Sequence, residues 1–217
     1  MKTHILTLPA ALFALSLVSC ENPADKTADA AVKEKVEKTA ATTATTDATA
    51  TTAGTKYVFT PESTIGFVGS KVTGSHTGGF KTFTGHFTVK DGRPVGNDHK
   101  VVIDMASTTS DNEKLTGHLK APDFFDVEKF PQTTFDVTEL KAGDNGKYTV
   151  AGNFTLHGVT KNISFPATVT QGSDTVTIKA EFDIKRKDFG IVYPGKAEDL
   201  IRDEVVIKLD LTAKPEA

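Results

Sequence analysis

From residue 57 to the end of the chain, apolar and polar residues alternate in one segment after another. In residues 175–185 every even-numbered position is apolar and every odd-numbered one is polar, and in residues 204–212 the odd-numbered positions are apolar. The same spacing recurs in shorter stretches. These are residues 83–89, 101–105, 135–137, 148–156 and 163–169. A period of two buries one face of a strand and exposes the other, so the sequence predicts a mainly β domain.

Short turn sequences separate these segments, which favours antiparallel hairpins. About eight one-sided strands can close into a barrel or form a sandwich, and we expect an all-β barrel with one or two short helices. One helix is predicted from a capping box at residues 110–113 to Pro122, and a second helical turn at 194–200. Dense unlike charges on the polar faces, as in residues 179–185, favour a soluble barrel over a membrane-spanning one.

Charge, cysteine content and motif content exclude several classes of function. The chain has 25 basic and 28 acidic residues, so it lacks the basic excess typical of nucleic-acid binding. Its single cysteine cannot form an internal disulfide or a cysteine-based zinc or iron–sulfur site. Histidine pairs at metal-site spacing, nucleotide-binding loops and hydrolase elbows are missing from the sequence. We therefore expect no nucleic-acid partner, no metal, no required cofactor and no enzymatic activity.

The first twenty residues have the pattern of an export signal. Residues 5–18 form an uncharged, mostly apolar run of 14 after Lys2, too short for a comfortable membrane span. The run ends in Leu-Val-Ser-Cys at residues 17–20, which resembles the bacterial lipobox. The alternative is an ordinary secretory signal with an incidental cysteine. We expect residues 1–19 to be a signal peptide and Cys20 to carry the acyl chains of a lipid anchor. Glu21 after the cysteine favours the outer membrane, with the protein facing the periplasm.

Residues 20–55 are predicted to be a flexible tether between that anchor and a folded domain at residues 56–214. Residues 21–38 are rich in alanine and charge and offer little to bury, and 14 of the 15 residues in 39–53 are Ala or Thr. Such a composition cannot offset the entropy lost on ordering. A tether of this length would let the domain reorient near a membrane.

Four segments together resemble the YceI-like family. In order they are HLKAPDFFDVEKFP at residues 118–131, GNFTLHGVTK at 152–161, RKDFGI at 186–191 and DEVVI at 203–207. The resemblance covers about residues 57–213. It implies an eight-stranded antiparallel lipocalin-like barrel whose elongated apolar cavity binds a polyisoprenoid lipid, such as a quinone or polyprenyl lipid, in the cell envelope. Residues 63–79 match the family in part and are glycine-rich, so a different lipid head group is expected if they line the cavity mouth.

Thirteen of the 14 phenylalanines lie in this domain, and alternation alone does not decide whether they fill the barrel or line a cavity. The candidate ligand-binding residues are inward-facing apolar side chains with two polar ones. They are Phe83, Phe87, His118, Phe124, Phe125, Phe135, Phe154, Phe182, Ile184, Arg186 and Phe189. One phenylalanine of the Asp-Phe-Phe run at 123–125 is expected to plug the barrel under the helix.

Two polar residues have competing interpretations. A buried Arg186 needs a partner, and Asp123 or Asp126 could form a structural ion pair with it. His118 could lie near the lipid or serve as a helix-cap partner. For the whole domain we expect an anchored lipid-binding protein that sequesters or carries an isoprenoid. The alternatives are an envelope interaction protein with a filled barrel, its protein partner unknown, and an enzyme that acts on an amphiphile through His118 and Asp123.

Overall fold

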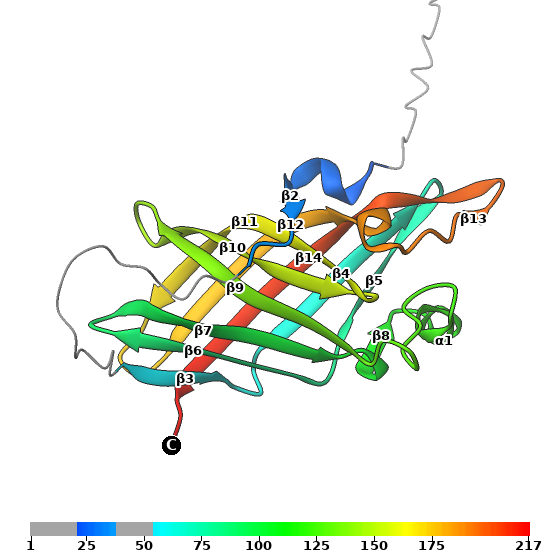
Figure 1. Ribbon diagram of the computed structural model, residues 1–217. Coiled ribbons are helices and arrows are strands. Elements are labelled where there is room, and N and C mark those ends of the chain that lie inside the picture. The colour runs from blue at the N-terminus through cyan, green and yellow to red at the C-terminus, as the bar shows by residue number, and fades with distance from the viewer. Residues whose placement is uncertain (1–20, 38–53) are drawn as a thin grey trace, which may run out of the picture.

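Eight strands form a closed antiparallel barrel in the computed structural model, which describes residues 21–37 and 54–217 (Figure 1). In spatial order the ring consists of β12 (Val176–Lys185), β11 (Val159–Gln171), β10 (Lys147–Leu156), β9 (Gln132–Ala142), β7 (Arg93–Asp104), β6 (Phe83–Lys90), β3 (Thr55–Phe59) and β14 (Asp199–Pro215). The β12–β14 pair closes the ring over ten residues of each strand. The predicted eight-stranded all-β barrel is confirmed.

One edge of β14 pairs with β12, and the other edge is shared between β3 and β4, which makes the two ends of the barrel different. Its last residues, 213–215, pair with β3, whereas residues 201–210 pair with β4 (Thr64–Lys71). From β4 the sheet continues into β5 (Gly74–Phe80) and β8 (Thr108–Ser110). The ring of eight therefore closes fully at the β3 end. At the other end, β4, β5 and β8 extend the sheet beyond β14.

A single α-helix among the described residues, α1 (Glu113–Lys120), lies at the end of the barrel opposite β3 (Figure 1). The predicted helix is confirmed, but its N-cap is Asn112, whose side-chain oxygen accepts the Leu115 amide at 3.0 Å. Ser110 instead hydrogen-bonds Thr116 at 2.9 Å. The part of the chain that the structure describes has no helix long and apolar enough to cross a membrane.

Within residues 21–37 and 54–217, three 3₁₀ turns and the short β13–β14 hairpin complete the elements. The turns are η1 (Pro23–Lys26), η2 (Met105–Ser107) and η3 (Arg186–Phe189). The helical turn predicted at residues 194–200 is wrong, because β13 (Gly195–Lys196) pairs there with Asp199 and Leu200 of β14. Gly195 has φ +85°, a left-handed conformation that suits a reversing chain rather than a helix.

Residues 21–37, which we call the strap, pack against the barrel. They contain η1 and the short strands β1 (Ala28–Asp29) and β2 (Ala31–Glu34), and Ala24 and Ala30 are buried. The prediction of a flexible tether is wrong for these residues, because small side chains suffice where strand edges offer hydrogen bonds. Residues 1–20 and 38–53, with the predicted signal peptide, Cys20 and the Ala/Thr tract, lie outside the described residues.

The strap fills a gap in the barrel wall. β11 and β12 pair with each other over only four residues, 168–171 with 176–179. Beyond that ladder, β1 pairs with residues 182–183 of β12, and β2 pairs with residues 161–164 of β11. The Ala30 amide donates to the Asp183 carbonyl at 2.9 Å. The strap thus completes the hydrogen bonding between two ring strands that have separated.

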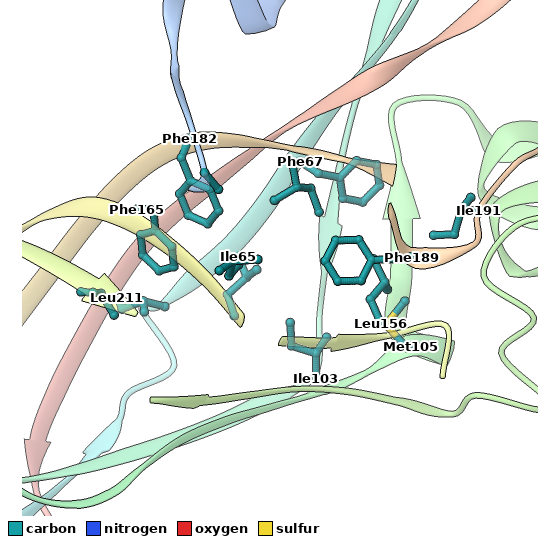
Figure 2. Packing of buried hydrophobic residues seen from close by; sticks show 14 of the residues in the cluster. Ile65, Phe67, Ile103, Met105, Leu156, Phe165, Phe182, Phe189, Ile191 and Leu211 are labelled. Carbon is teal, nitrogen blue, oxygen red and sulfur yellow. The ribbon is translucent and has the colours of Figure 1, made fainter. Parts of the chain in front are cut away.

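The interior divides into two parts. At the β3 end, which we call the packed end, Phe87, Val89, Val176 and Ala213 form a small buried cluster with Tyr57 and Phe59 against it. The larger cluster occupies the remainder of the barrel, toward α1 and β13, which we call the mouth end (Figure 2).

Candidate functional site

A cavity of about 410 Å³ lies inside the mouth end of the barrel. Its wall is formed mainly by aliphatic and aromatic side chains of the inward strand faces. These are Ile65, Phe67, Phe80, Val101, Ile103, Phe135, Phe154, Leu156, Ile163, Phe165, Phe182, Ile184, Ile201, Val205, Ile207, Leu209 and Leu211, to which Ile191 is added from the loop after residue 189. The period of two puts the strand residues among them on the inward face of the barrel, where they pack beside one another around the cavity.

Paired aromatic rings form one side of the wall. Phe165 of β11 and Phe182 of β12 stack with ring centroids 3.9 Å apart and an interplanar angle of 7° (Figure 2). Phe135 lies beside Phe165, with its ring centroid 5.6 Å away. The stack spans the two strands that the strap separates, and it gives the cavity a flat apolar surface.

Close approach of strand β5 to β4 depends on glycine. A Cβ at Gly78 would lie 2.2 Å from the ring of Phe67 and 2.7 Å from the Thr109 carbonyl oxygen. The Phe67 ring therefore crosses β5 where a side chain would block it. This explains part of the glycine-rich segment at residues 74–79, which forms β5 and contributes His76 to the cavity lining.

Helix α1 and the loop after it cover the cavity on one side. Leu115 and Leu119 of α1 line it, as do Phe124 and Phe125 of the loop. Phe124 is buried and Phe125 half-buried, and their rings meet edge-on with centroids 5.8 Å apart. The predicted aromatic plug under the helix is present, and both rings contribute to it.

His118 lies among these rings at the mouth of the cavity. Its Nε2 is 2.9 Å from a carboxylate oxygen of Asp123, and its ring meets that of Tyr193 edge-on at 4.8 Å. The hydrogen bond to His118 lowers the pKa of the Asp123 carboxyl below its usual value. The His118 side chain lines the cavity and does not cap the helix.

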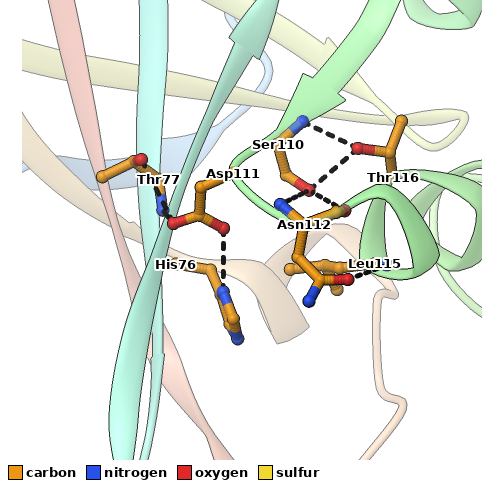
Figure 3. A network of polar contacts seen from close by, with 7 residues as sticks. All are labelled: His76, Thr77, Ser110, Asp111, Asn112, Leu115 and Thr116. Carbon is orange, nitrogen blue, oxygen red and sulfur yellow. Dashed lines mark hydrogen bonds and ion pairs between the residues drawn. The ribbon is translucent and has the colours of Figure 1, made fainter.

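Two further polar groups fix the segments around the mouth. Lys71, at the end of β4, hydrogen-bonds the Asp199 carboxylate, and this contact lowers the pKa of Asp199. His76 of β5 is 2.8 Å from Asp111, which also accepts the Thr77 amide at 2.8 Å (Figure 3). The Thr77 hydrogen bond is the main cause of the lowered pKa of Asp111. Together these contacts join the β4–β5 hairpin to β14 and to the start of α1.

Arg186 is buried, with 3% of its surface exposed, and it lines the cavity. Its guanidinium donates to the backbone carbonyls of Ile191 at 2.6 Å, Arg202 at 3.0 Å and Ile201 at 3.2 Å. Desolvation lowers the pKa of Arg186, opposed by the charge of Asp203. The predicted ion pair with Asp123 or Asp126 is wrong: backbone oxygens satisfy the guanidinium, and Asp123 bonds His118.

Eight of the eleven candidate ligand residues line the cavity. They are His118, Phe124, Phe125, Phe135, Phe154, Phe182, Ile184 and Arg186. The other three are elsewhere: Phe87 belongs to the packed-end cluster, Phe83 packs against the larger cluster, and Phe189 is fully buried against Phe154. Contact with a ligand remains a prediction for the first eight, whereas the last three do not reach the cavity.

Sequence reasoning missed several lining residues. Ile163 and Phe165 stood in an alternating segment and carried the same signal as Phe182, whereas Tyr193 lies in an irregular segment with no periodic signal. No cluster of three His, Cys, Asp or Glu side chains that could hold a metal ion occurs within residues 21–37 and 54–217. The chemistry of the site is therefore that of an apolar container with a polar mouth.

Comparison with known proteins gives a consistent match. Residues 57–213 match the YceI-like domain. The UPF0312 proteins of Yersinia pestis and Yersinia enterocolitica are 39% identical over 120 residues, which covers 52% of this chain and 62% of theirs. This chain therefore spans less than two thirds of the length of those curated relatives.

Solved structures share the fold. The crystal structure of Burkholderia cenocepacia BcnA is 27% identical, with a TM-score of 0.63 over 70% of this chain and 97% of that one. A polyisoprenoid binding domain from Saccharophagus degradans, implicated in plant cell wall breakdown, has the same TM-score at 18% identity, over 76% of this chain and 100% of that one. Because its identity is only 18%, the similarity to the Saccharophagus degradans domain shows the fold alone.

Proposed function

The chain belongs to the YceI-like family, and on that premise we propose that it binds a long-chain polyisoprenoid lipid, of the quinone or polyprenyl type, in the cavity at the mouth end. The observation that carries the proposal is the cavity itself. Its volume of about 410 Å³ falls within the roughly 300–1,000 Å³ typical of small-molecule sites, and its wall is almost wholly apolar.

Burial of a hydrocarbon chain supplies the binding energy. Each buried CH₂ group contributes about 0.8 kcal/mol, so a chain of tens of carbons binds well even after the cost of ordering. The stacked rings of Phe165 and Phe182 offer a flat surface for the planar, branched units of an isoprenoid. A straight polar ligand would leave its hydrogen-bonding groups unpaired against this wall.

The mouth provides the few polar contacts that a head group needs. His118 and Lys71 line the cavity there, and each already bonds a carboxylate, Asp123 and Asp199 respectively. Their remaining hydrogen-bonding capacity suits a quinone carbonyl or a hydroxyl. His76, from the glycine-rich β5, lines the same region, so this strand influences which head group is accepted.

We also propose that the protein is a lipoprotein of the bacterial cell envelope. The lipobox-like residues 17–20 support cleavage before Cys20 and acylation of that residue, and Glu21 supports the outer membrane, facing the periplasm. Two or more acyl chains hold a protein stably on a bilayer. In this proposal the protein sequesters or carries its lipid without chemical change and is not an enzyme.

The alternative of a filled barrel with only an interaction role loses its premise, because the mouth end contains a cavity. The alternative of an enzyme acting through His118 and Asp123 gains only their hydrogen bond of 2.9 Å. Such a pair also occurs as a simple surface contact, since both side chains are partly exposed.

Mass spectrometry of an organic extract tests the binding function. The protein to use is residues 20–217 with Cys20→Ser, which keeps every described residue and carries no acyl chain. We expect a stoichiometric polyprenyl or quinone species. An empty extract, repeated after incubation with envelope lipids, would contradict the proposal.

A matched pair of glycine variants tests whether the lipid occupies this cavity. Gly69 and Gly74 both have open space where a Cβ would be, but only Gly69 lines the cavity. Gly69→Phe should place its ring in the cavity and weaken lipid binding by ~tenfold, the equivalent of about 1.4 kcal/mol, so that less lipid is recovered in the extract. Gly74→Phe should leave the content unchanged. Equal lipid content in both variants would place the ligand elsewhere.

A further inference from the structure

Exposed aliphatic side chains concentrate around the mouth of the cavity. Only four large apolar side chains of the described chain are strongly exposed, and three of them, Val72, Val192 and Leu200, lie next in sequence to cavity-lining residues. Val72 is 54% exposed and Leu200 50%. The Val72 amide donates to the Leu200 carbonyl at 3.2 Å, so these two lie side by side. We call Val72, Val192 and Leu200 the rim.

The strap brings the beginning of the described chain to the same end of the barrel. Asn22 accepts a hydrogen bond from the Ser70 hydroxyl at 3.3 Å, two residues before Val72. Turn η1 packs against β14, where Val206 is buried. Because Asn22 bonds Ser70, the described chain begins beside the rim.

From these contacts we propose that the rim is a membrane-docking surface, which inserts Val72, Val192 and Leu200 into the interface of a lipid bilayer and turns the cavity mouth toward it. This proposal rests on the proposed function. With the mouth against the bilayer, a lipid could pass between bilayer and cavity without crossing water. The occupant is a bilayer because the exposed side chains are aliphatic and the described chain begins beside them, one residue after the proposed site of acylation.

The balanced charge around the rim predicts that it contacts a membrane through apolar groups. Lys71 is paired with Asp199, and the exposed Lys196 on the β13 hairpin is accompanied by the exposed Glu198. Opposite charges thus balance around the aliphatic side chains. The rim should bind through its apolar groups, so vesicle binding should depend little on salt or on anionic lipid.

Vesicle flotation with matched variants tests the proposal. The parent protein is residues 20–217 with Cys20→Ser, and the vesicles contain phosphatidylethanolamine with phosphatidylglycerol. We expect Val72→Ser combined with Leu200→Ser to lower vesicle binding by ~tenfold. Val36→Ser is the control, because Val36 is 43% exposed but bonds Asn153 of β10 and, unlike the rim residues, is not next in sequence to a cavity-lining residue.

A fluorescent probe gives an independent reading. In the Cys20→Ser protein an introduced cysteine is unique, so an environment-sensitive dye can be placed by Val72→Cys, Leu200→Cys or Val36→Cys. Vesicles should shift the emission to the blue at positions 72 and 200 and leave position 36 unchanged. A parent that does not bind vesicles, or an equal response at all three positions, would overturn the proposal.

The lipid content of the same proteins separates this proposal from the proposed function. Loss of vesicle binding in the rim variants with lipid still in the extract supports both ideas. Rim-dependent vesicle binding with an empty extract supports the docking surface and contradicts the lipid-binding function. Lipid in the extract of a protein that does not bind vesicles through its rim supports the lipid-binding function and contradicts the docking surface.

Discussion

The packed end of the barrel is closed by ring strands alone, whereas the mouth end also uses segments outside the ring, among them β4 and β5. At the packed end β11 and β12 pair directly, and β3 joins β14 to β6. At the mouth end the strap lies between β11 and β12, and α1 with its following loop covers the interior. The same alternating pattern is therefore filled where the ring is tight and hollow where it spreads.

Truncation of one phenylalanine at each end should show the largest difference in stability between the two ends. Phe87→Ala removes a buried ring from the packed end and should lower the free energy of unfolding by about 3–5 kcal/mol. Phe125→Ala removes a half-buried ring that already faces the cavity, and the loss should be about 1–2 kcal/mol. Urea unfolding measures both. Equal losses would mean that the mouth end is packed as tightly as the other end.

Removal of the buried guanidinium should have the next largest effect. Arg186→Met leaves the carbonyls of Ile191, Ile201 and Arg202 without that donor, and we expect a loss of about 3 kcal/mol. Lys187→Met is the control on the neighbouring residue, whose side chain is half-exposed. Should both variants unfold at the same urea concentration, Arg186 would not be what holds these strand ends together.

Deletion of the strap tests whether the mouth end needs it. Residues 55–217 should be less stable than residues 20–217 by about 2 kcal/mol, because strand edges of β11 and β12 lose partners. The shorter protein should also retain less lipid, since Ile163 and Phe182 line the cavity at this seam. Lys35→Ala, an exposed change in the strap, serves as the control. Unchanged stability and lipid content would show that the strap is only an attachment.

The smallest expected effect concerns pH. Asp183 lies under the strap, 2% exposed, and accepts the Thr27 hydroxyl at 2.8 Å. Burial raises its pKa, the Thr27 hydrogen bond opposes this, and the charges of Asp29 and Glu204 raise it further. The ionised form is therefore disfavoured when the strap is docked. Strap docking should strengthen as pH falls from about 7 toward the raised pKa and level off below the ordinary Asp pKa of about 3.9.

Hydrogen exchange in the strap measures this dependence once rates are corrected for the intrinsic effect of pH. Asp183→Asn keeps a hydrogen-bonding side chain without the charge, and it should increase protection at pH ~7 by about 1 kcal/mol and flatten the pH profile. Asp210→Asn, an exposed change on β14, is the control. A steeper profile in the Asp183 variant would contradict the account.

The sequence predicted what local spacing can encode. Alternation identified the strands that bear Phe135, Phe165 and Phe182, and the turn and capping residues identified α1. Alternation says which face of a strand is inward, but the width of the barrel depends on which strands close it. That pairing is non-local, which explains why Phe87 and Phe182 looked equivalent in the sequence.

The strap and the partners of Arg186 were beyond local reasoning for a related reason. The strap buries only two small apolar side chains, Ala24 and Ala30, and becomes ordered because separated strands offer unpaired backbone groups. Arg186 was expected to seek a carboxylate because side chains are visible in a sequence and backbone carbonyls are not. Both cases turn on hydrogen bonds that exist only after the barrel has formed.

The most direct test of the central claim is a crystal structure of residues 20–217 purified with their lipid. The account predicts continuous density for an isoprenoid chain inside the mouth end, from the region of His118 and Arg186 toward Leu211, with the strap in place between β11 and β12. Density for lipid on the outer surface, or a mouth end filled by its own side chains, would contradict it.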